Sequence, residues 1–284
     1  MKLGIHAYAW CSQWSNDTLH LIDQVASLGL DFIEIPLMCL DTFDAAAVRE
    51  RLQTAGIGAV TSTVLLEGTD ITSDDPAVRA SGVDYLTACV EATHAIGATS
   101  FSGVIFAQHT RTLSRRPEAR HWQYSADSLR HVARRARELG VTIGIEPVNR
   151  YETFLINTCE QALELKDMIG TDNVRIHLDT YHMNIEEKGI AQGILDARDH
   201  LRYIHLSESD RGTPGTGTVA WDEIFAALRA VGFRGGLAME SFINMPPEIG
   251  YGLSVWRPVA SGEAEVMENG LPFLRNKARQ YGLI

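Results

Sequence analysis

The chain has 284 residues, of which 45% are hydrophobic and 21% are charged, and its formal net charge is -11. This composition predicts a folded globular protein with a large core. The acidic balance argues against a nucleic-acid partner, because binding to a phosphate backbone relies on clustered Lys and Arg. We expect no membrane span either, since uncharged stretches such as residues 52–66 are short and contain Gly, Ser, Thr and Gln.

The chain contains four widely spaced cysteines and no CxxC pair. This pattern favours reduced thiols in a cytoplasmic protein over a disulfide framework or a zinc knuckle. The N-terminal sequence MKLGIHAYAW is interrupted by His6, so we interpret it as a first strand and not as a signal peptide.

Short apolar segments alternate with longer amphipathic segments along the whole chain. The predicted strands are residues 3–8, 32–35, 58–64, 99–106, 141–146, 174–179, 203–206 and 236–240. The predicted helices lie near residues 18–28, 45–55, 76–96, 125–139, 159–169, 189–200, 221–231 and 263–281. Six glycines lie just past the predicted helix ends, where a left-handed cap favours glycine: Gly29, Gly56, Gly97, Gly140, Gly170 and Gly232.

Eight strand–helix units predict a parallel sheet that closes into a (β/α)8 TIM barrel, an α/β fold, with residues 1–284 forming a single domain. An open doubly wound sheet is the alternative. It is disfavoured because no GxGxxG sequence follows the first strand, so the dinucleotide-binding fingerprint is missing.

Two connections are long, residues 107–124 and 241–261. Both follow strands, so both lie over the C-terminal face of the barrel, where barrel enzymes place their active sites. The first contains Arg111, Arg115, Arg116 and Arg120. Its role stays open between a lid over the site, a solvated loop and a subunit contact.

Polar residues stand at the ends of the last four predicted strands: Glu146, Asp179, His205 and Glu240. Because side chains alternate along a strand, each of these residues lies opposite an apolar set that suits packing against helices. The four side chains should therefore point into the barrel mouth and converge. Taken singly, each is more simply explained as a structural hydrogen-bonding group.

Taken together, three carboxylates and one imidazole suit Mn²⁺ or Mg²⁺, with Co²⁺ also possible, better than a thiolate-rich zinc site. His177 lies two residues before Asp179 on the same strand face, one layer deeper in the barrel. We expect it to support the ligating carboxylates from the outer shell; a core histidine bonded only to backbone is the alternative.

Four segments carry a family resemblance: EPVNRYET at 146–153, HLDTYHMNIEE at 177–187, HLSESDRGTPGTG at 205–217 and MESF at 239–242. They resemble the D-tagatose 3-epimerase and D-allulose (psicose) 3-epimerase family of xylose-isomerase-like barrels, and the resemblance covers nearly the whole chain.

The resemblance implies that Glu146, Asp179, His205 and Glu240 bind the metal. It also implies that Glu146 and Glu240 form the acid/base pair, and that Glu152, His182 and Arg211 hold the oxygens of the sugar. Phe242 and Trp14 would pack against the sugar. His6 and the segments 62–66 and 106–109 fall at pocket walls where members of the family differ, so they would contribute to the choice of substrate.

These roles fit the chemistry of a ketose 3-epimerase acting on free sugars. Inversion at C3 requires removal of the proton next to the C2 carbonyl and its return to the other face, which explains two carboxylates. A divalent metal, with Mn²⁺ first, would stabilise the enediolate. We also expect a cytoplasmic homo-oligomer, either a dimer or a tetramer.

Several alternatives use the same residues. The first is a sugar-phosphate epimerase that grips the phosphate with the Arg-rich loop, and related ones are an aldose–ketose isomerase and an inosose dehydratase. A metal-dependent endonuclease acting on abasic DNA would need more His and Asp ligands and a basic surface. A non-catalytic metal-dependent sugar-binding protein would need no second carboxylate.

Overall fold

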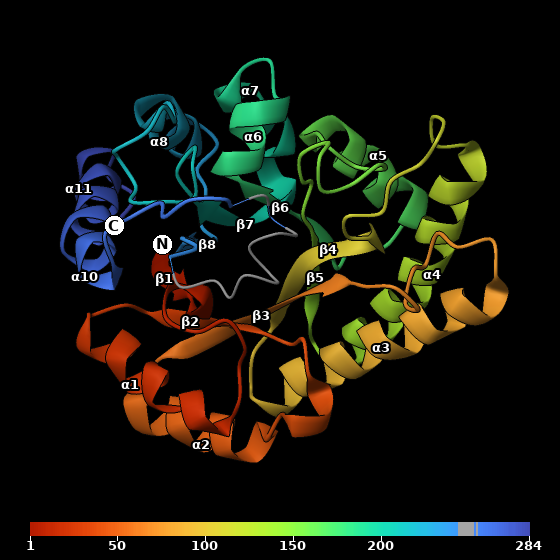
Figure 1. Cartoon of the computed structure of the whole chain (residues 1–284), viewed down its shortest axis with the longest axis horizontal. Coiled ribbons are helices and arrows are strands. Elements are labelled where there is room, and N and C mark those ends of the chain that lie inside the picture. Colours follow the sequence, from red (N-terminus) through yellow and green to blue (C-terminus); the bar gives the residue numbers. More distant parts are fainter. Residues whose placement is uncertain (244–252, 254) are drawn as a thin grey trace.

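The computed structural model describes residues 1–243, 253 and 255–284, in which eight parallel strands close into a barrel surrounded by helices (Figure 1). The strands follow one another around the ring in chain order, and β1 pairs with both β2 and β8. They are β1 Lys2–His6, β2 Phe32–Pro36, β3 Gly58–Leu65, β4 Ser100–Gln108, β5 Thr142–Ile145, β6 Val174–Asp179, β7 Leu201–Leu206 and β8 Gly236–Met239. The predicted TIM barrel is confirmed.

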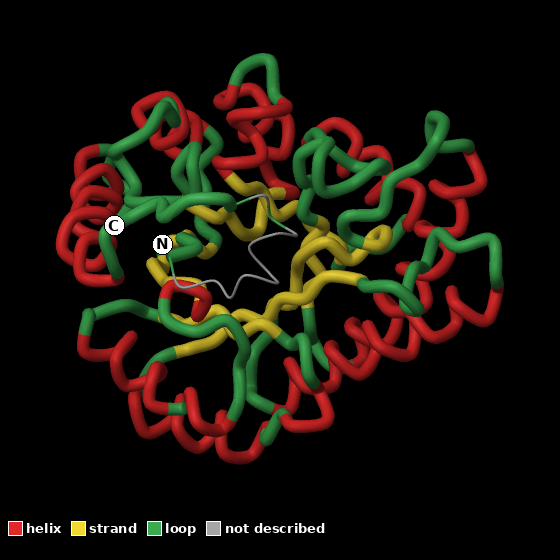
Figure 2. Tube along the Cα trace, viewed as in Figure 1, coloured by secondary structure: helices red, strands yellow, loops and turns green. Residues whose placement is uncertain are grey.

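The helices form the outer ring, with loops on the rims (Figure 2). The longer ones are α1 His20–Ser27, α2 Ala45–Ala55, α3 Pro76–Ala95, α4 Ala119–Glu138, α5 Cys159–Ile169, α6 Thr180–Glu186, α7 Ile190–Ala197, α8 Trp221–Ala230 and α11 Leu271–Gln280. Short helical segments are η1 Ala7–Ala9, η2 Asn16–Thr18, η3 Leu40–Thr42, η4 Arg198–His200, α10 Glu263–Glu265 and η5 Val266–Gly270. All six predicted capping glycines have positive φ. None of the helices in the described ranges is long and apolar enough to cross a membrane.

One helix begins earlier in the chain than predicted, and another helix is not predicted at all. Helix α4 begins at Ala119 and not near residue 125, because Glu118 and His121 form a capping box there. The segment after Asp179, for which no helix is predicted, forms the helix α6. The Asp179 carboxylate accepts a hydrogen bond from the backbone N–H of Tyr181 and so caps this helix.

The barrel has an outer and an inner packing layer. Outward-facing residues such as Ile143, Ile176 and Leu237 join the main core between strands and helices. A small separate cluster fills the barrel interior: Phe32, Val60, Tyr203 and Ala238. A Cβ atom on Gly144 would come within 2.8 Å of Ser102 and 3.3 Å of the His177 side chain. Glycine at this position therefore leaves room for an imidazole inside the barrel.

The chain ends lie close together, with the N-terminus beside β1 and the C-terminus beside α11 (Figure 1). The N-terminal ammonium of Met1 donates a hydrogen bond to the carbonyl of Leu283 at 3.1 Å. Within the second long connection, 241–261, residues 244–252 and 254 lie outside the described residues.

Candidate active site

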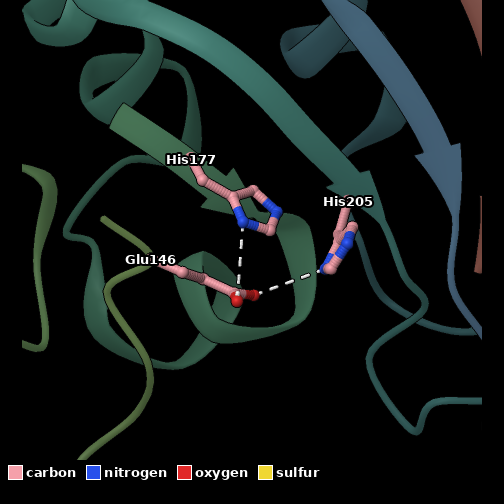
Figure 3. A group of neighbouring side chains, drawn as sticks. All are labelled: Glu146, His177 and His205. Atoms are coloured by element: carbon pink, nitrogen blue, oxygen red, sulfur yellow. Dashed lines mark ion pairs between the residues drawn. The ribbon is translucent and has the colours of Figure 1, made fainter. Parts of the chain in front are cut away.

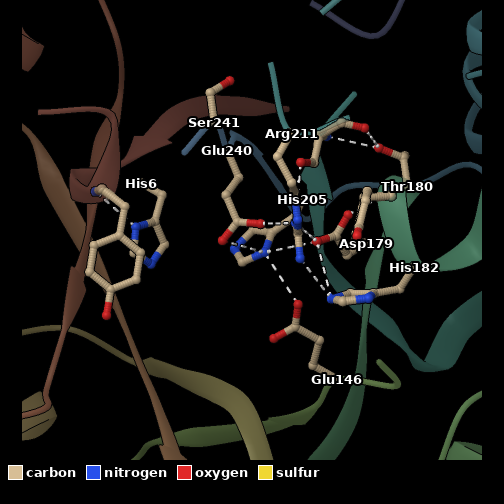
Figure 4. Close-up of polar contacts among 12 residues, drawn as sticks. His6, Glu146, Asp179, Thr180, His182, His205, Arg211, Glu240 and Ser241 are labelled. Atoms are coloured by element: carbon tan, nitrogen blue, oxygen red, sulfur yellow. Dashed lines mark hydrogen bonds and ion pairs between the residues drawn. The ribbon is translucent and has the colours of Figure 1, made fainter. Parts of the chain in front are cut away.

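Three carboxylates face one imidazole at the C-terminal mouth of the barrel (Figure 4). Glu146 directly follows β5, Asp179 ends β6, and Glu240 directly follows β8. His205 lies on β7, and its Nδ1 atom is 3.3 Å from Glu146 Oε1, 3.5 Å from Glu240 Oε1 and 3.9 Å from Asp179 Oδ2. All four side chains are buried. The structure thus brings together the four residues that the strand pattern predicts to converge.

This donor set fits a divalent cation. The Nδ1 atom of His205 is buried and has no hydrogen-bond partner among the described residues. Burial raises the pKa of Glu146, of Asp179 and of Glu240, because desolvation penalises the charged carboxylate. Among the described residues that contact these carboxylates, Arg211 alone carries a permanent charge. A dication would compensate the remaining negative charge.

Arg211 connects the carboxylates to the pocket wall. Its Nη1 group donates to Asp179 Oδ2 at 2.7 Å and to Glu240 Oε2 at 2.6 Å. The guanidinium lies over the rings of Tyr181 and Phe242, at 3.9 and 4.7 Å from their centroids. The backbone φ of Arg211 is 66°, a left-handed conformation that costs free energy for a residue with a side chain. Such strain is typical of functional positions, and the side chain is buried, not exposed.

His182, on α6, presents a hydrogen-bond donor to the pocket. Its Nδ1 atom accepts from the backbone N–H of Asn149 at 3.1 Å, so the neutral ring carries its proton on Nε2. Burial lowers the pKa of His182 to about 4, which keeps the ring neutral at pH 7. Its Nε2 atom lies 2.9 Å from Nη2 of Arg211, so two donors face each other. A ligand oxygen beside them could accept a hydrogen bond from both.

Glu152 lies at the far end of the same polar network. Its Oε1 atom accepts from the side-chain amide of Asn149 at 2.8 Å, and its Oε2 atom accepts from His109 Nε2 at 3.0 Å. Burial would raise the pKa of Glu152, but His182 and His109 lower it to about 2. The ionised carboxylate can therefore accept a hydrogen bond from a ligand hydroxyl at neutral pH.

These groups line a cavity of about 490 Å³ in the barrel mouth. Its walls include five apolar or aromatic residues from several strands and loops: Tyr8, Val64, Leu66, Val148 and Phe242. Such a mixture of apolar wall and few polar groups is typical of small-molecule sites. The four arginines of the Arg-rich loop are not among its lining residues.

Two further predicted site residues, His6 and Trp14, lie in different environments. His6 lines the cavity, with its Nε2 atom 3.3 Å from Ser62 Oγ. Burial lowers the pKa of His6 to about 4. Trp14 lies in the main core and is not among the lining residues, so the structure gives no support to its predicted contact with the sugar.

His177 lies beside the carboxylate of Glu146 (Figure 3). Its Nδ1 atom is 3.5 Å from Glu146 Oε2, and its ring meets that of His205 edge-on with centroids 4.1 Å apart. The side chain is fully buried, and neither ring nitrogen has a hydrogen-bond partner within the described ranges. The alternative of a histidine bonded to backbone is therefore wrong for the part of the chain that is described.

Sequence reasoning missed Glu34, which lies in the barrel interior on β2. Its Oε2 atom is 2.6 Å from His205 Nε2 and accepts from the Tyr203 hydroxyl. Burial would raise the pKa of Glu34, but His205 and His6 hold it well below its usual range. The available signal was its position in FIEIP, where the glutamate shares the inward face with Phe32 and Pro36.

Comparisons with known proteins give a consistent result. The family model described as xylose isomerase-like TIM barrel matches residues 22–268. The chain is 36% identical over 280 residues to a ketose 3-epimerase of Arthrobacter globiformis, covering 98% of this chain and 96% of that protein. It is 35% identical over 283 residues to an L-ribulose 3-epimerase of Methylomonas sp. (strain DH-1), covering 98% of each.

A solved structure of similar fold is that of a D-allulose 3-epimerase from Methylomonas sp. in complex with D-allulose. Its TM-score against this chain is 0.93 at 34% sequence identity, and the match covers 98% of this chain and 97% of that one. These matches confirm the resemblance that the four sequence motifs indicate.

Proposed function

Because this chain belongs to the xylose isomerase-like TIM barrel family, we propose that it is a metal-dependent ketose 3-epimerase acting on free ketoses. Substrate pairs of the kind D-fructose/D-allulose, D-tagatose/D-sorbose and L-ribulose/L-xylulose would be interconverted at C3. The observation that carries this proposal is the pair of buried glutamates, Glu146 and Glu240, which reach one imidazole from β5 and β8. These strands are separated in the barrel by β6 and β7.

In this mechanism the two glutamates divide the proton transfer. One carboxylate removes the proton from C3, and the other, in its acid form, returns a proton to the opposite face of the enediolate. Burial raises the pKa of both groups, because desolvation penalises the charged carboxylate, and this favours the acid form that one of them needs. In the reverse reaction the two glutamates exchange roles.

Glu146, Asp179, His205 and Glu240 would hold the metal, and we propose Mn²⁺, with Co²⁺ or Mg²⁺ as alternatives. A bound divalent ion would supply Lewis-acid stabilisation of the negative charge that develops on the substrate oxygens.

His177 would support the carboxylate of Glu146 from one layer deeper in the barrel. Replacing it with Ala should weaken ion binding about 10–100-fold, and an unchanged dissociation constant in a folded variant would contradict this role.

The remaining polar groups suit the hydroxyls of a sugar. His182 and Arg211 offer donors on one side of the cavity, and Glu152 offers an acceptor. Phe242 contributes an aromatic face to the same cavity, which suits the C–H face of a sugar. We therefore assign these four residues to substrate binding.

The charge pattern favours a free sugar over a sugar phosphate. In the Arg-rich loop, Arg111 pairs with Asp70, Arg115 with Glu118, and Arg120 with both Asp74 and Glu118. Three of the four arginines of this loop already hold carboxylates, which leaves less positive charge for a phosphate. We therefore interpret the loop, which follows β4, as a structural segment that is paired by these arginines with the connection after β3.

We also propose a cytoplasmic homo-oligomer, a dimer or a tetramer. All four cysteines are free thiols, which suits a reducing compartment. Sedimentation analysis of the purified chain would determine the oligomeric state, and a monomer at micromolar concentration would contradict this part.

A sugar panel with and without metal tests the proposed function. Protein stripped with EDTA should not convert D-fructose, D-tagatose or L-ribulose, and added Mn²⁺ or Co²⁺ should restore the conversion. D-fructose 6-phosphate should be a poorer substrate by kcat/KM. Full activity in protein shown by elemental analysis to contain no metal would contradict the metal mechanism. A preference for the phosphate that is lost in Arg115→Ala and Arg116→Ala would favour the sugar-phosphate alternative.

A further inference from the structure

We propose that Glu34 is a positioning residue that orients the metal-ligating His205, and it also lies beside the pocket-wall His6. This inference rests on the proposed function, because it assigns His205 to the metal. Glu34 lies on β2, whereas the four proposed ligands come from β5 to β8. A metal ligand from the second half of the barrel would thus be oriented by a residue from the first half.

The sequence places Glu34 on the inward face of its strand. In the register of the barrel, Glu34 lies opposite His6 on β1 and opposite Val60 on β3. The side chain is fully buried. A carboxylate in the centre of a barrel costs free energy unless hydrogen bonds compensate it, so its partners indicate its role.

The contact with His205 determines which nitrogen of that ring is free. Glu34 Oε2 lies 2.6 Å from His205 Nε2, and an ionised carboxylate can only accept a hydrogen bond. The proton of the neutral imidazole is therefore on Nε2. The lone pair is then on Nδ1, the atom that faces Glu146, Asp179 and Glu240. Carboxylate–histidine pairs of this kind fix the ring orientation at metal sites and increase the basicity of the ligand.

A second histidine, His6, lies on the other side of the same carboxylate. The Nδ1 atom of His6 accepts from the backbone N–H of Tyr8 at 3.1 Å, so its proton is on Nε2. This Nε2 atom lies 3.3 Å from Ser62 Oγ and 3.5 Å from Glu34 Oε1. Because His6 lines the cavity, one buried carboxylate links the proposed metal centre to the substrate wall.

The Tyr203 hydroxyl provides a matched control. It donates to the same Oε2 atom of Glu34 but contacts neither the carboxylate ligands nor the cavity in the described residues. Tyr203→Phe removes one hydrogen bond to Glu34 and leaves both its charge and its bond to His205. Glu34→Gln keeps an acceptor oxygen and the side-chain volume but removes the charge.

The test is metal affinity, measured without substrate by the visible absorption of Co²⁺ and by competition with a chelator. We expect Glu34→Gln to weaken binding about 10–100-fold and Tyr203→Phe to change it less than about threefold, with both variants folded by circular dichroism. Turnover of D-fructose by Glu34→Gln should recover when the metal concentration exceeds the new dissociation constant, since Glu34 is not among the residues that line the cavity.

Three results would overturn the inference. Wild-type affinity in Glu34→Gln would show that the carboxylate does not support the metal ligand. Equal losses in Glu34→Gln and Tyr203→Phe would assign the effect to packing of the barrel interior. If the wild-type chain bound no Co²⁺ or Mn²⁺ at all, the metal site of the proposed function would fail as well, and this outcome is distinguishable from the first two.

Discussion

Glu146 and Glu240 are the residues that the proposed chemistry depends on most. Glu146→Gln and Glu240→Gln should each reduce kcat by several orders of magnitude, because each removes an acid/base group and a ligand oxygen. Acid–base catalysis alone accounts for about 10²–10⁴-fold. Steady-state kinetics with metal content determined in parallel would separate the two losses. Glu164→Gln, on the exposed side of α5, is the control. Near-normal turnover of either variant with metal bound would contradict the two-carboxylate mechanism.

The buried neutral histidines predict how stability depends on pH. Burial lowers the pKa of His6 to about 4, below its value near 6.5 in an unfolded chain. Between these values the unfolded chain binds a proton that the folded chain does not, so the free energy of unfolding decreases as the pH falls from about 6.5 to about 4. His6→Asn should reduce that slope by up to about 1.4 kcal/mol per pH unit. Urea unfolding at pH 5, 6 and 7 measures it, and equal slopes in the two proteins would contradict the assignment.

Glu208 organises the connection between β7 and α8, which carries Arg211. Its buried carboxylate accepts hydrogen bonds from the backbone N–H groups of Ser209, Gly215 and Val219 and from the indole N–H of Trp221. One side chain therefore holds both ends of a loop that keeps Arg211 in a left-handed backbone conformation.

Glu208→Gln should destabilise this loop, because the amide replaces one acceptor oxygen with a donor and leaves N–H groups unpaired. We expect a loss of about 1–3 kcal/mol in the free energy of unfolding and a raised KM for the ketose. Denaturant unfolding and steady-state kinetics measure the two effects. Glu223→Gln, on the exposed side of α8, should change neither. An unchanged KM in Glu208→Gln would mean that Arg211 is positioned without this loop.

The strand ends show which elements the sequence predicts well. Alternation along β5 to β8 separates an apolar outer face from the inner face, and this pattern is local. It therefore places Glu146, Asp179, His205 and Glu240 on the inner face without knowledge of the tertiary structure. The start of α6 was missed because Asp179 is both a proposed ligand and the helix cap. A polar stretch such as TYHMN has no strong helical periodicity of its own.

Glu34 and Asn149 show what the sequence pattern does not contain. A single glutamate in an apolar strand is ambiguous, because its partners His205 and Tyr203 lie about 170 residues away in the chain. Asn149 connects Glu152 to His182 through its side-chain amide, a contact that depends on the folded loop. For Trp14 the sequence predicts a contact with the sugar, but its aromatic ring lies in the core and not at the cavity wall.

At the scale of the whole molecule, the two halves of the barrel contribute different parts of the site. Strands β5 to β8 supply the four proposed metal ligands, while β1, β3 and β4 bring His6, Val64 and His109 to the cavity wall. In TIM barrels the C-terminal face carries the chemistry, and variation of its loops changes the substrate. We therefore expect substrate preference to be determined mainly by the first half of this barrel and the reaction by the second half.

The central claim is that one carboxylate removes a proton from C3 of a ketose and that the other returns a proton to C3. Both carboxylates exchange their protons with solvent. NMR analysis of D-fructose incubated with the Mn²⁺-loaded protein in D2O tests it most directly. Our account predicts D-allulose with one deuterium at C3 and no deuterium at C1, and no conversion in protein stripped of metal. Deuterium at C1, as an aldose–ketose isomerase would introduce, or D-allulose that retains hydrogen at C3, would contradict it.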